Sequence, residues 1–224
     1  RLAGKIRVVP IKVLSNGGSG SFSAVTTALQ SVYKEVADLI KSGTFVVYNF
    51  SLGGGTPVAS TEAELAKARK AGVFVVAAAG NSGAPGVIYP ASGEASHAIG
   101  AVNNALGRAY FSTTGPEVEY AAPGQGIYST YPPDVYRELS GTSMATPHAG
   151  AVAAIIGSIY PNATAEDVAA HIAKYSKDLG TPGRDNEFGY GLADIAAMLA
   201  NAPGGGTPDP DPDPDPDPDP GPDP

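Results

Sequence analysis

The sequence of 224 residues contains no cysteine. It therefore cannot form a disulfide bond or a zinc site with cysteine ligands, although this absence excludes no cellular compartment. No apolar run approaches the ~20 residues that a membrane-spanning helix needs, so we expect no membrane partner. A chain of this length can still bury a substantial core, which predicts a single globular domain.

Positive charge is also scarce. The formal net charge is −8, with 14 Lys and Arg against 22 Asp and Glu. Seven of the acids are aspartates within residues 201–224, so the rest of the chain is nearly neutral. Neither part has the basic surplus of a nucleic-acid-binding domain, and we expect no nucleic-acid partner.

The composition changes at residue 201. After Pro203 and three glycines, the sequence repeats Asp-Pro to its end. Proline favours extended backbone and neighbouring aspartates repel one another, which predicts a disordered or extended linker over residues 201–224 and a further domain beyond it. A calcium-binding acidic tract is the alternative, but repeated prolines would keep the carboxylates from surrounding one ion. We therefore predict one domain over residues 1–200 and a linker after it.

Short apolar runs alternate with helical patterns along the first 200 residues. The strand-like runs cover residues 6–14, 44–50, 73–79, 98–102 and 118–121. Residues 24–41 carry apolar side chains at helical spacing, and Thr61 with Glu64 forms a capping-box signature for a second helix. Later helices are expected after a cap at Thr164 and over residues 192–199. This alternation predicts an α/β fold with a mainly parallel sheet flanked by helices.

The most informative stretch runs from Gly141 to His148 and reads Gly-Thr-Ser-Met-Ala-Thr-Pro-His. Residues 149–159 are almost all apolar and predict a buried helix that begins near Ser143, with Pro147 in its first turn. Free N–H groups and the positive end of the helix dipole converge there, which suits a developing oxyanion. Ser143 is therefore a candidate nucleophile, and an ordinary helix cap at Thr142 or Ser143 is the alternative.

This octapeptide resembles the nucleophile motif of the subtilisin-like serine proteases, the subtilases. Other segments resemble the same family in the same order along the chain. They are residues 49–54, 75–83, 89–92, 98–102, 121–124 and 189–192. The resemblance implies a three-layer α/β fold with its N-terminal part missing, and a secreted serine endopeptidase. It also implies structural calcium, for which we can place no ligands.

The resemblance further assigns the groups that acyl transfer requires. Ser143 matches the nucleophile, which forms an acyl-enzyme with the substrate. Asn81 matches the asparagine that donates to the oxyanion together with the backbone N–H of Ser143. A turn residue before Gly83 is the simpler interpretation of Asn81, and the two roles are compatible.

An extended polypeptide substrate is expected to add a strand to two backbone segments. The binding residues that the resemblance implies are Gly18, Ser19, Gly20, Phe22, Ser51, Leu52, Gly53, Ala78, Ala79 and Gly80. The pocket beside the scissile bond is expected between residues 51–53 and 77–80. No charge occurs in either segment, so we expect an apolar or aromatic side chain there, and Ile88 near the pocket floor would favour a smaller one.

The family's catalytic Asp and His precede the serine within short motifs of the Asp-Thr-Gly and His-Gly-Thr type, and neither motif occurs here. His148 lies five residues beyond Ser143, roughly 140° around a helix from it. His97 and His171 match no catalytic position. We therefore expect both groups upstream of Arg1, and expect this chain alone to be nearly inactive. A non-catalytic peptide-binding pseudoprotease module is the alternative.

Overall fold

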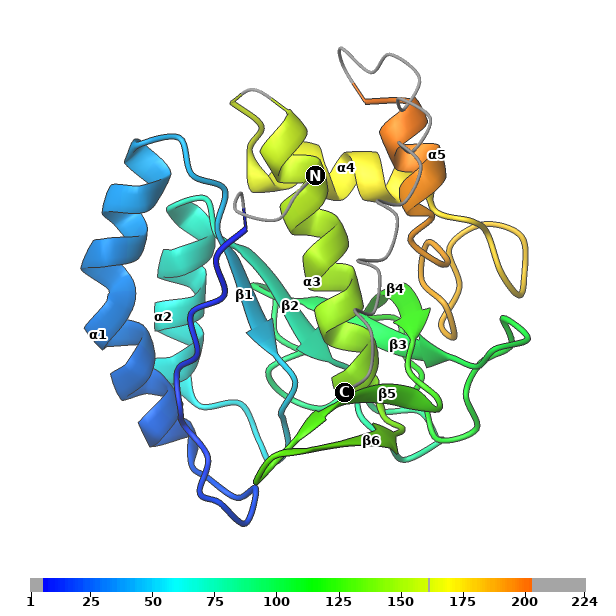
Figure 1. Ribbon diagram of the computed structural model, residues 1–224, viewed down its shortest axis with the longest axis horizontal. Coiled ribbons are helices and arrows are strands. Elements are labelled where there is room, and N and C mark those ends of the chain that lie inside the picture. Colours follow the sequence, from blue (N-terminus) through cyan, green and yellow to red (C-terminus); the bar gives the residue numbers. More distant parts are fainter. Residues whose placement is uncertain (1–5, 161, 203–224) are drawn as a thin grey trace, which may run out of the picture.

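The computed structural model describes residues 6–160 and 162–202 (Figure 1). At its centre is a four-stranded sheet of order β1-β2-β3-β4, in which all neighbours run parallel. Its strands are β1 (Val47–Phe50), β2 (Phe74–Ala78), β3 (His97–Val102) and β4 (Val118–Pro123). One face packs against helices α1 (Phe22–Lys41) and α2 (Ala59–Lys70), and the other against α3 (Thr142–Ile159), α4 (Ala165–Tyr175) and α5 (Ile195–Ala200). The three-layer α/β architecture expected from the sequence is confirmed.

Strand β2 is buried along its whole length, and its side chains alternate between the two faces of the sheet. Phe74 and Val76 belong to the core on the α3 side, whereas Val75 and Ala77 belong to the core on the side of α1 and α2. A strand covered on both faces has no position for a polar side chain. The continuous apolar run in the sequence follows from this location.

The capping box expected at Thr61 and Glu64 is wrong. Helix α2 begins earlier, at Ala59, and Thr61 is fully buried within it. The hydroxyl of Thr61 forms a hydrogen bond of 2.8 Å with the hydroxyl of Thr26 on α1, so this side chain joins two helices instead of capping one. The cap expected at Thr164 is confirmed, as part of a complete capping box.

Residues 6–13 do not form the buried strand that their sequence predicts. They pair with no other strand in the described ranges, and Val8 and Val9 are 85% and 57% exposed. The parallel sheet ends at β1 as far as the structure describes it. Because a strand requires a neighbour for its backbone N–H and C=O groups, this segment stays irregular at the surface, where Arg7 forms an ion pair with Glu35 of α1.

Helix α3 is buried on one side only, although its apolar sequence predicts burial all round. Ala145, Ala153 and Ile156 lie in the core, while Ala151 and Ser158 are exposed. An antiparallel hairpin that the sequence analysis missed precedes α3 along the chain, formed by β5 (Ile127–Tyr131) and β6 (Val135–Leu139). These two runs are rich in β-branched and aromatic residues and are separated by a Pro-Pro-Asp turn, which is the signal that could have revealed them.

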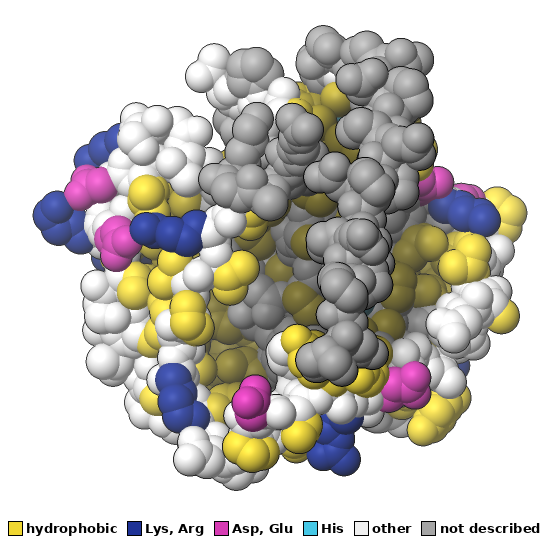
Figure 2. Space-filling model, in the orientation of Figure 1, with side chains coloured by type: hydrophobic (Ala, Val, Ile, Leu, Met, Phe, Trp, Pro, Cys, Tyr) yellow, Lys and Arg dark blue, Asp and Glu magenta, His cyan; other side chains and the backbone are white. Residues whose placement is uncertain are grey.

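Charged side chains are scattered over the face shown in Figure 2, where Lys and Arg do not gather into one area. In the described ranges, no helix combines the length and the apolar character needed to cross a membrane. Residues 203–224 lie outside the described residues, so the linker and the domain boundary before it stay predictions.

Candidate functional site

Asn81 and Ser143 come together at the edge of the sheet where the parallel strands end. Asn81 follows β2, and Ser143 is the second residue of α3. The side-chain oxygen Oδ1 of Asn81 accepts hydrogen bonds from the backbone N–H of Thr142 at 2.8 Å and from the Thr142 hydroxyl at 3.0 Å. That hydroxyl also accepts from the backbone N–H of Gly80 at 3.2 Å. Thr142 thus ties the turn after β2 to the start of α3.

These bonds determine the orientation of the Asn81 carboxamide. Both donors from Thr142 occupy Oδ1, which leaves the Nδ2 amide as the donating end of an exposed side chain. A Cβ atom placed on Gly141 would lie 3.5 Å from Nδ2, so this donor sits beside the first residues of α3. The N-terminal N–H groups of α3 lie at the same place. Two kinds of N–H donor thus lie near Ser143, and their use for an oxyanion stays a prediction.

The backbone carbonyl of Ser143 accepts a hydrogen bond from a side chain that directly follows β1. In a regular helix this carbonyl would accept from the residue four positions later, but that residue is Pro147, which has no N–H. The hydroxyl of Ser51 donates to it instead at 2.7 Å, and Nδ2 of Asn49 donates to the Ser51 hydroxyl at 3.0 Å. Pro147 therefore lies inside α3 and not in its first turn, and it frees the carbonyl that anchors Ser143 to the end of β1.

Thr113 is a second threonine that the sequence analysis did not assign. It is fully buried and brackets Asn81: its N–H donates to the carbonyl of Gly80 at 3.0 Å, and its hydroxyl accepts from the N–H of Ser82 at 3.1 Å. Gly80, which directly precedes Asn81, has a φ of +116°, a value that only glycine adopts readily. No motif contains Thr113, so only the fold could reveal its contact with the Asn81 turn.

The segments expected to bind substrate lie at the same edge of the molecule as Asn81 and Ser143. Ser51, Leu52 and Gly53 directly follow β1, while Ala78 ends β2 and Ala79 and Gly80 follow it. Gly18, Ser19 and Gly20 are exposed just before α1. Phe22 and Leu52 pack against the core cluster that contains Tyr89, and the Phe22 and Tyr89 rings are 4.9 Å apart. The structure brings these residues together, and their binding role stays a prediction.

Comparison with known proteins identifies the family of this chain. The sequence model of the Subtilase family matches residues 2–191. The chain belongs to the subtilase family. It is 38% identical over 200 residues to subtilisin DY of Bacillus licheniformis, covering 88% of this chain and 69% of that protein. It is 37% identical over 202 residues to the minor extracellular protease Epr of Bacillus subtilis, covering 90% of this chain but 30% of that protein.

A solved structure, that of sphericase, is similar in fold, with a TM-score of 0.74 and 28% sequence identity. The match covers 81% of this subtilase and 66% of the sphericase chain. The chain thus spans only part of the length of its relatives.

The side chains of all three histidines of this subtilase form hydrogen bonds with groups other than the Ser143 hydroxyl. Nδ1 of His148 lies 2.8 Å from the carbonyl of Met144, and His171 contacts the hydroxyl of Tyr160 and the carbonyl of Met198. His97, at the start of β3, lies 2.7 Å from a carboxylate oxygen of Glu119. No imidazole in the described ranges is placed to accept the proton of Ser143.

The pair of His97 and Glu119 is instead a buried feature near the amino ends of the strands. Burial is the largest single influence on the Glu119 carboxyl and would raise its pKa, whereas the hydrogen bond and the charge of His97 lower it. Tyr120 and Arg184 act in the same direction, and the pKa of Glu119 is lowered overall. The pair contributes to stability in a place separate from Ser143.

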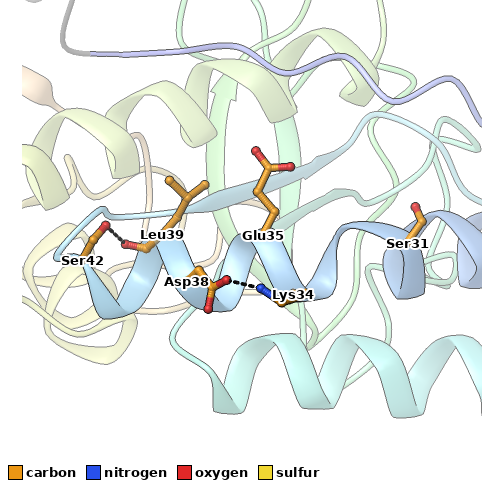
Figure 3. A pocket seen from close by; sticks show the side chains of 6 residues that line it. All are labelled: Ser31, Lys34, Glu35, Asp38, Leu39 and Ser42. Carbon is orange, nitrogen blue, oxygen red and sulfur yellow. Dashed lines mark hydrogen bonds and ion pairs between the residues drawn. The ribbon is translucent and has the colours of Figure 1, made fainter.

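A surface hollow of the subtilase lies along α1 and contains none of the residues expected at the site (Figure 3). Its lining residues are Ser31, Lys34, Glu35, Asp38, Leu39 and Ser42, all from α1 and the residue after it. Within it, Lys34 and Asp38 form an ion pair of 2.7 Å with each other. Within the part of the chain that the structure describes, no three His, Asp or Glu side chains are grouped as a metal site. Calcium stays a prediction from the resemblance.

Proposed function

We propose that this protein is a serine endopeptidase that forms an acyl-enzyme on Ser143, with Asn81 as an oxyanion donor. The observation that carries the proposal is the pair of bonds from Thr142 to Oδ1 of Asn81, at 2.8 and 3.0 Å. They hold Nδ2 toward the start of α3 before any substrate arrives. Donors fixed in advance stabilise a transition state without reorganisation. The protease names of the relatives support the same reaction class.

In this reaction the Ser143 oxygen attacks the carbonyl carbon of a peptide bond and loses its proton to a base. The negative charge on the former carbonyl oxygen is stabilised by Nδ2 of Asn81 and by the backbone N–H of Ser143. Collapse of the tetrahedral intermediate breaks the C–N bond, and the base returns its proton to the leaving amine. Water then repeats the sequence and releases the acid product.

The base and the carboxylate that orients it are not supplied by the described residues. We infer that they come from a segment upstream of Arg1 in a longer parent protein, and that the 224-residue chain has little activity alone. A site that keeps its oxyanion donors but lacks part of the triad retains about 10³–10⁴-fold acceleration over water, a magnitude known from subtilisin and not obtained from this structure.

The substrate that we propose is an extended polypeptide. It would lie along residues 18–20 and 51–53, adding a strand to their exposed backbone. Secretion is part of the proposal, because the relative from Bacillus subtilis is described as extracellular. A further domain after the Asp-Pro linker and a structural calcium ion remain proposals from the sequence, and no step of the reaction depends on either.

A second candidate is a peptide-binding module without catalysis. The arrangement of the histidines favours it, since His97, His148 and His171 are all bonded elsewhere. Such a module would bind peptides in the groove without hydrolysing them.

Covalent labelling separates the two candidates. A fluorophosphonate is incubated with the chain and with the parent form that includes the upstream segment, and intact mass reports the adduct. We expect rapid labelling of the parent form, slow labelling of the chain, and none in the Ser143→Ala variant. Ser158→Ala, an exposed serine at the other end of α3, is the matched control and should label normally. A parent form that binds peptides without labelling or cleaving them would establish the non-catalytic module instead.

A further inference from the structure

Asn16 and Gly17 occupy the two central positions of an exposed turn before α1. The N–H of Gly18 donates to the carbonyl of Ser15 at 3.0 Å, which closes the turn. Ser15 is held a second time, because its own N–H donates to the carbonyl of Ser19 at 2.8 Å. Both ends of the turn are therefore fixed, whereas Asn16 and Gly17 are exposed between them. Asn16 is the only asparagine of the sequence that is followed by glycine.

The carboxamide of Asn16 and the backbone nitrogen of Gly17 are both free to react. Among the residues that the structure describes, none forms a hydrogen bond with that carboxamide or with that N–H. A Cβ atom placed on Gly17 would meet only the hydroxyl of Ser15, at 3.7 Å, so the space beside the nitrogen is open. Glycine itself has no Cβ atom that would shield its nitrogen. The side-chain carbon Cγ of Asn16 can therefore be approached by the nitrogen of the next residue.

The same two groups are held by hydrogen bonds at Asn81. Oδ1 of Asn81 accepts from the backbone N–H and from the hydroxyl of Thr142. The N–H of the next residue, Ser82, donates to the hydroxyl of Thr113 at 3.1 Å. These bonds must break before the carboxamide can meet the backbone nitrogen, and each broken bond adds to the barrier. Asn81 and Asn16 thus carry the same functional group in opposite states, one held and one free.

We propose that Asn16 is a site of spontaneous deamidation. The nitrogen of Gly17 loses its proton to hydroxide and attacks Cγ of Asn16, forming a cyclic succinimide. The bond from Cγ to Nδ2 breaks, and Nδ2 takes a proton from water and leaves as ammonia. A second water molecule then opens the ring at either carbonyl, which gives aspartate or isoaspartate. No enzyme or cofactor is needed, because a nucleophile in the same chain replaces a bimolecular encounter.

The products change the segment that directly follows the turn. In isoaspartate the main chain passes through the side-chain carbon, which inserts one methylene group between Ser15 and Gly17. The hydrogen bond from Gly18 to Ser15 then closes a longer ring and no longer holds residues 18–20 in the same position. These residues belong to the segment proposed to bind an extended peptide, so deamidation to isoaspartate weakens that binding. This consequence rests on the proposed peptidase function, whereas the deamidation itself does not.

Peptide mass spectrometry tests the modification. The 224-residue chain is aged in water enriched in heavy oxygen, both folded and unfolded in urea, and is then digested. We expect Asn16 to become an acid that carries one solvent oxygen at nearly the same rate in both states, and Asn81 to react more slowly in the folded chain. The rate at Asn16 should rise with pH, since resonance makes the protonated peptide nitrogen a poor nucleophile. Strong protection of Asn16 by folding would overturn the proposal.

Two variants give matched controls for the chemistry. Gly17→Ala keeps the asparagine and fits the open space beside Gly17, but its Cβ atom hinders the attacking nitrogen. We expect it to slow conversion of Asn16 at least about tenfold, which corresponds to a barrier higher by about 1.4 kcal/mol. Asn16→Gln keeps an amide but places its carbonyl carbon one bond further away, and should stay unmodified. Conversion of Asn16 at the wild-type rate in Gly17→Ala would exclude attack by the nitrogen of residue 17.

Peptide binding tests the consequence. An acetylated tetra-alanine amide is titrated into the isotope-labelled fresh chain and into the purified isoaspartate form, and the amide signals of Gly18 and Gly20 give the dissociation constants. We expect the isoaspartate form to bind at least about threefold more weakly. Asn16→Asp, which adds the charge without the methylene group, should bind like the fresh chain. Equal affinities, or no binding by either form, would overturn the consequence for residues 18–20. The peptidase function would still stand or fall separately, by the labelling of Ser143.

Discussion

The turn that contains Asn81 is held by several hydrogen bonds from other parts of the chain, whereas the segment of residues 6–13 lies exposed at the surface. Thr142 and Thr113 hold the Asn81 turn through hydrogen bonds of 2.8 to 3.2 Å. Residues 6–13 are more apolar than that turn, yet Val8 is 85% exposed. Composition therefore does not explain the contrast. The turn has partners from three other parts of the chain, whereas the segment has no strand beside it in the described ranges.

The difference shows that contacts from distant parts of the chain, and not composition, determine how firmly a segment is held. The Asn81 turn, which we propose as the oxyanion side of the site, is held by hydrogen bonds to Thr113 and Thr142. Residues 6–13 and one face of α3 stay exposed. Substitutions in the two regions test this contrast, and the largest effect is expected at Asn81.

Replacement of Asn81 by alanine removes the side-chain oxyanion donor. We expect the labelling rate of Ser143 in the parent form to fall by about 10²–10³-fold, which is the loss known for the same asparagine in subtilisin itself. Asn103→Ala is the matched control, because Asn103 also accepts backbone N–H bonds within a turn but lies away from Ser143. A fall of similar size in both variants would mean that turn stability, and not oxyanion binding, determines the rate.

Replacement of Glu119 by glutamine should lower stability without changing the labelling of Ser143. The pKa of Glu119 is lowered in the folded state, so its carboxylate stabilises the fold above the pKa of an unfolded glutamate. This contribution is lost as the pH falls through the lowered value. We expect the free energy of unfolding, measured with urea, to drop by about 1–2 kcal/mol at pH 7 and by much less at pH 3.

The exposed Glu117→Gln is the matched control for Glu119 and should change stability little at either pH. A loss at Glu119 that did not depend on pH would exclude the charge as its cause. A changed labelling rate would show that the two ends of the strands are coupled.

Replacement of Ser51 by alanine removes the donor to the Ser143 carbonyl. We expect a loss of about 1 kcal/mol, seen as a roughly fivefold lower labelling rate, because the carbonyl is left without its partner. Ser51→Thr keeps the hydroxyl and should keep the rate. In the double variant Ser51→Ala with Pro147→Ala, residue 147 regains an N–H four positions after Ser143 and should restore part of the rate. If the double variant shows no recovery, the effect of Ser51→Ala does not arise from the loss of a hydrogen bond to the carbonyl of Ser143.

Much of the fold could be predicted from the sequence, because local patterns and global packing agree there. The apolar run of β2 indicates a strand covered on both faces, and that is where β2 lies. The helical spacing of residues 24–41 predicts α1 to within two residues of its start. The motif around Ser143 indicates the start of α3, since Gly141 immediately precedes that helix.

The contacts that hold the site could not be predicted, because they join segments that are far apart in sequence. Thr113 and Thr142 matter for Asn81 only once β2, α3 and the turn before β4 are placed in space. Thr61 has the local signature of a cap, but its hydroxyl forms a hydrogen bond with that of Thr26 on another helix. Residues 6–13 have the pattern of a strand, and a pattern cannot show whether a partner strand is present.

Replacement of Val8 by serine tests this last point and should have the smallest effect. In the 224-residue chain Val8 is 85% exposed, so we expect the free energy of unfolding to change by less than about 0.5 kcal/mol. The same change at Val76, which is fully buried in β2, should cost several times more and serves as the matched contrast. We expect a segment upstream of Arg1 to pair with residues 6–13, in which case Val8→Ser should cost about 1–2 kcal/mol in the longer parent form. An equally small effect in both forms would mean that no such pairing occurs.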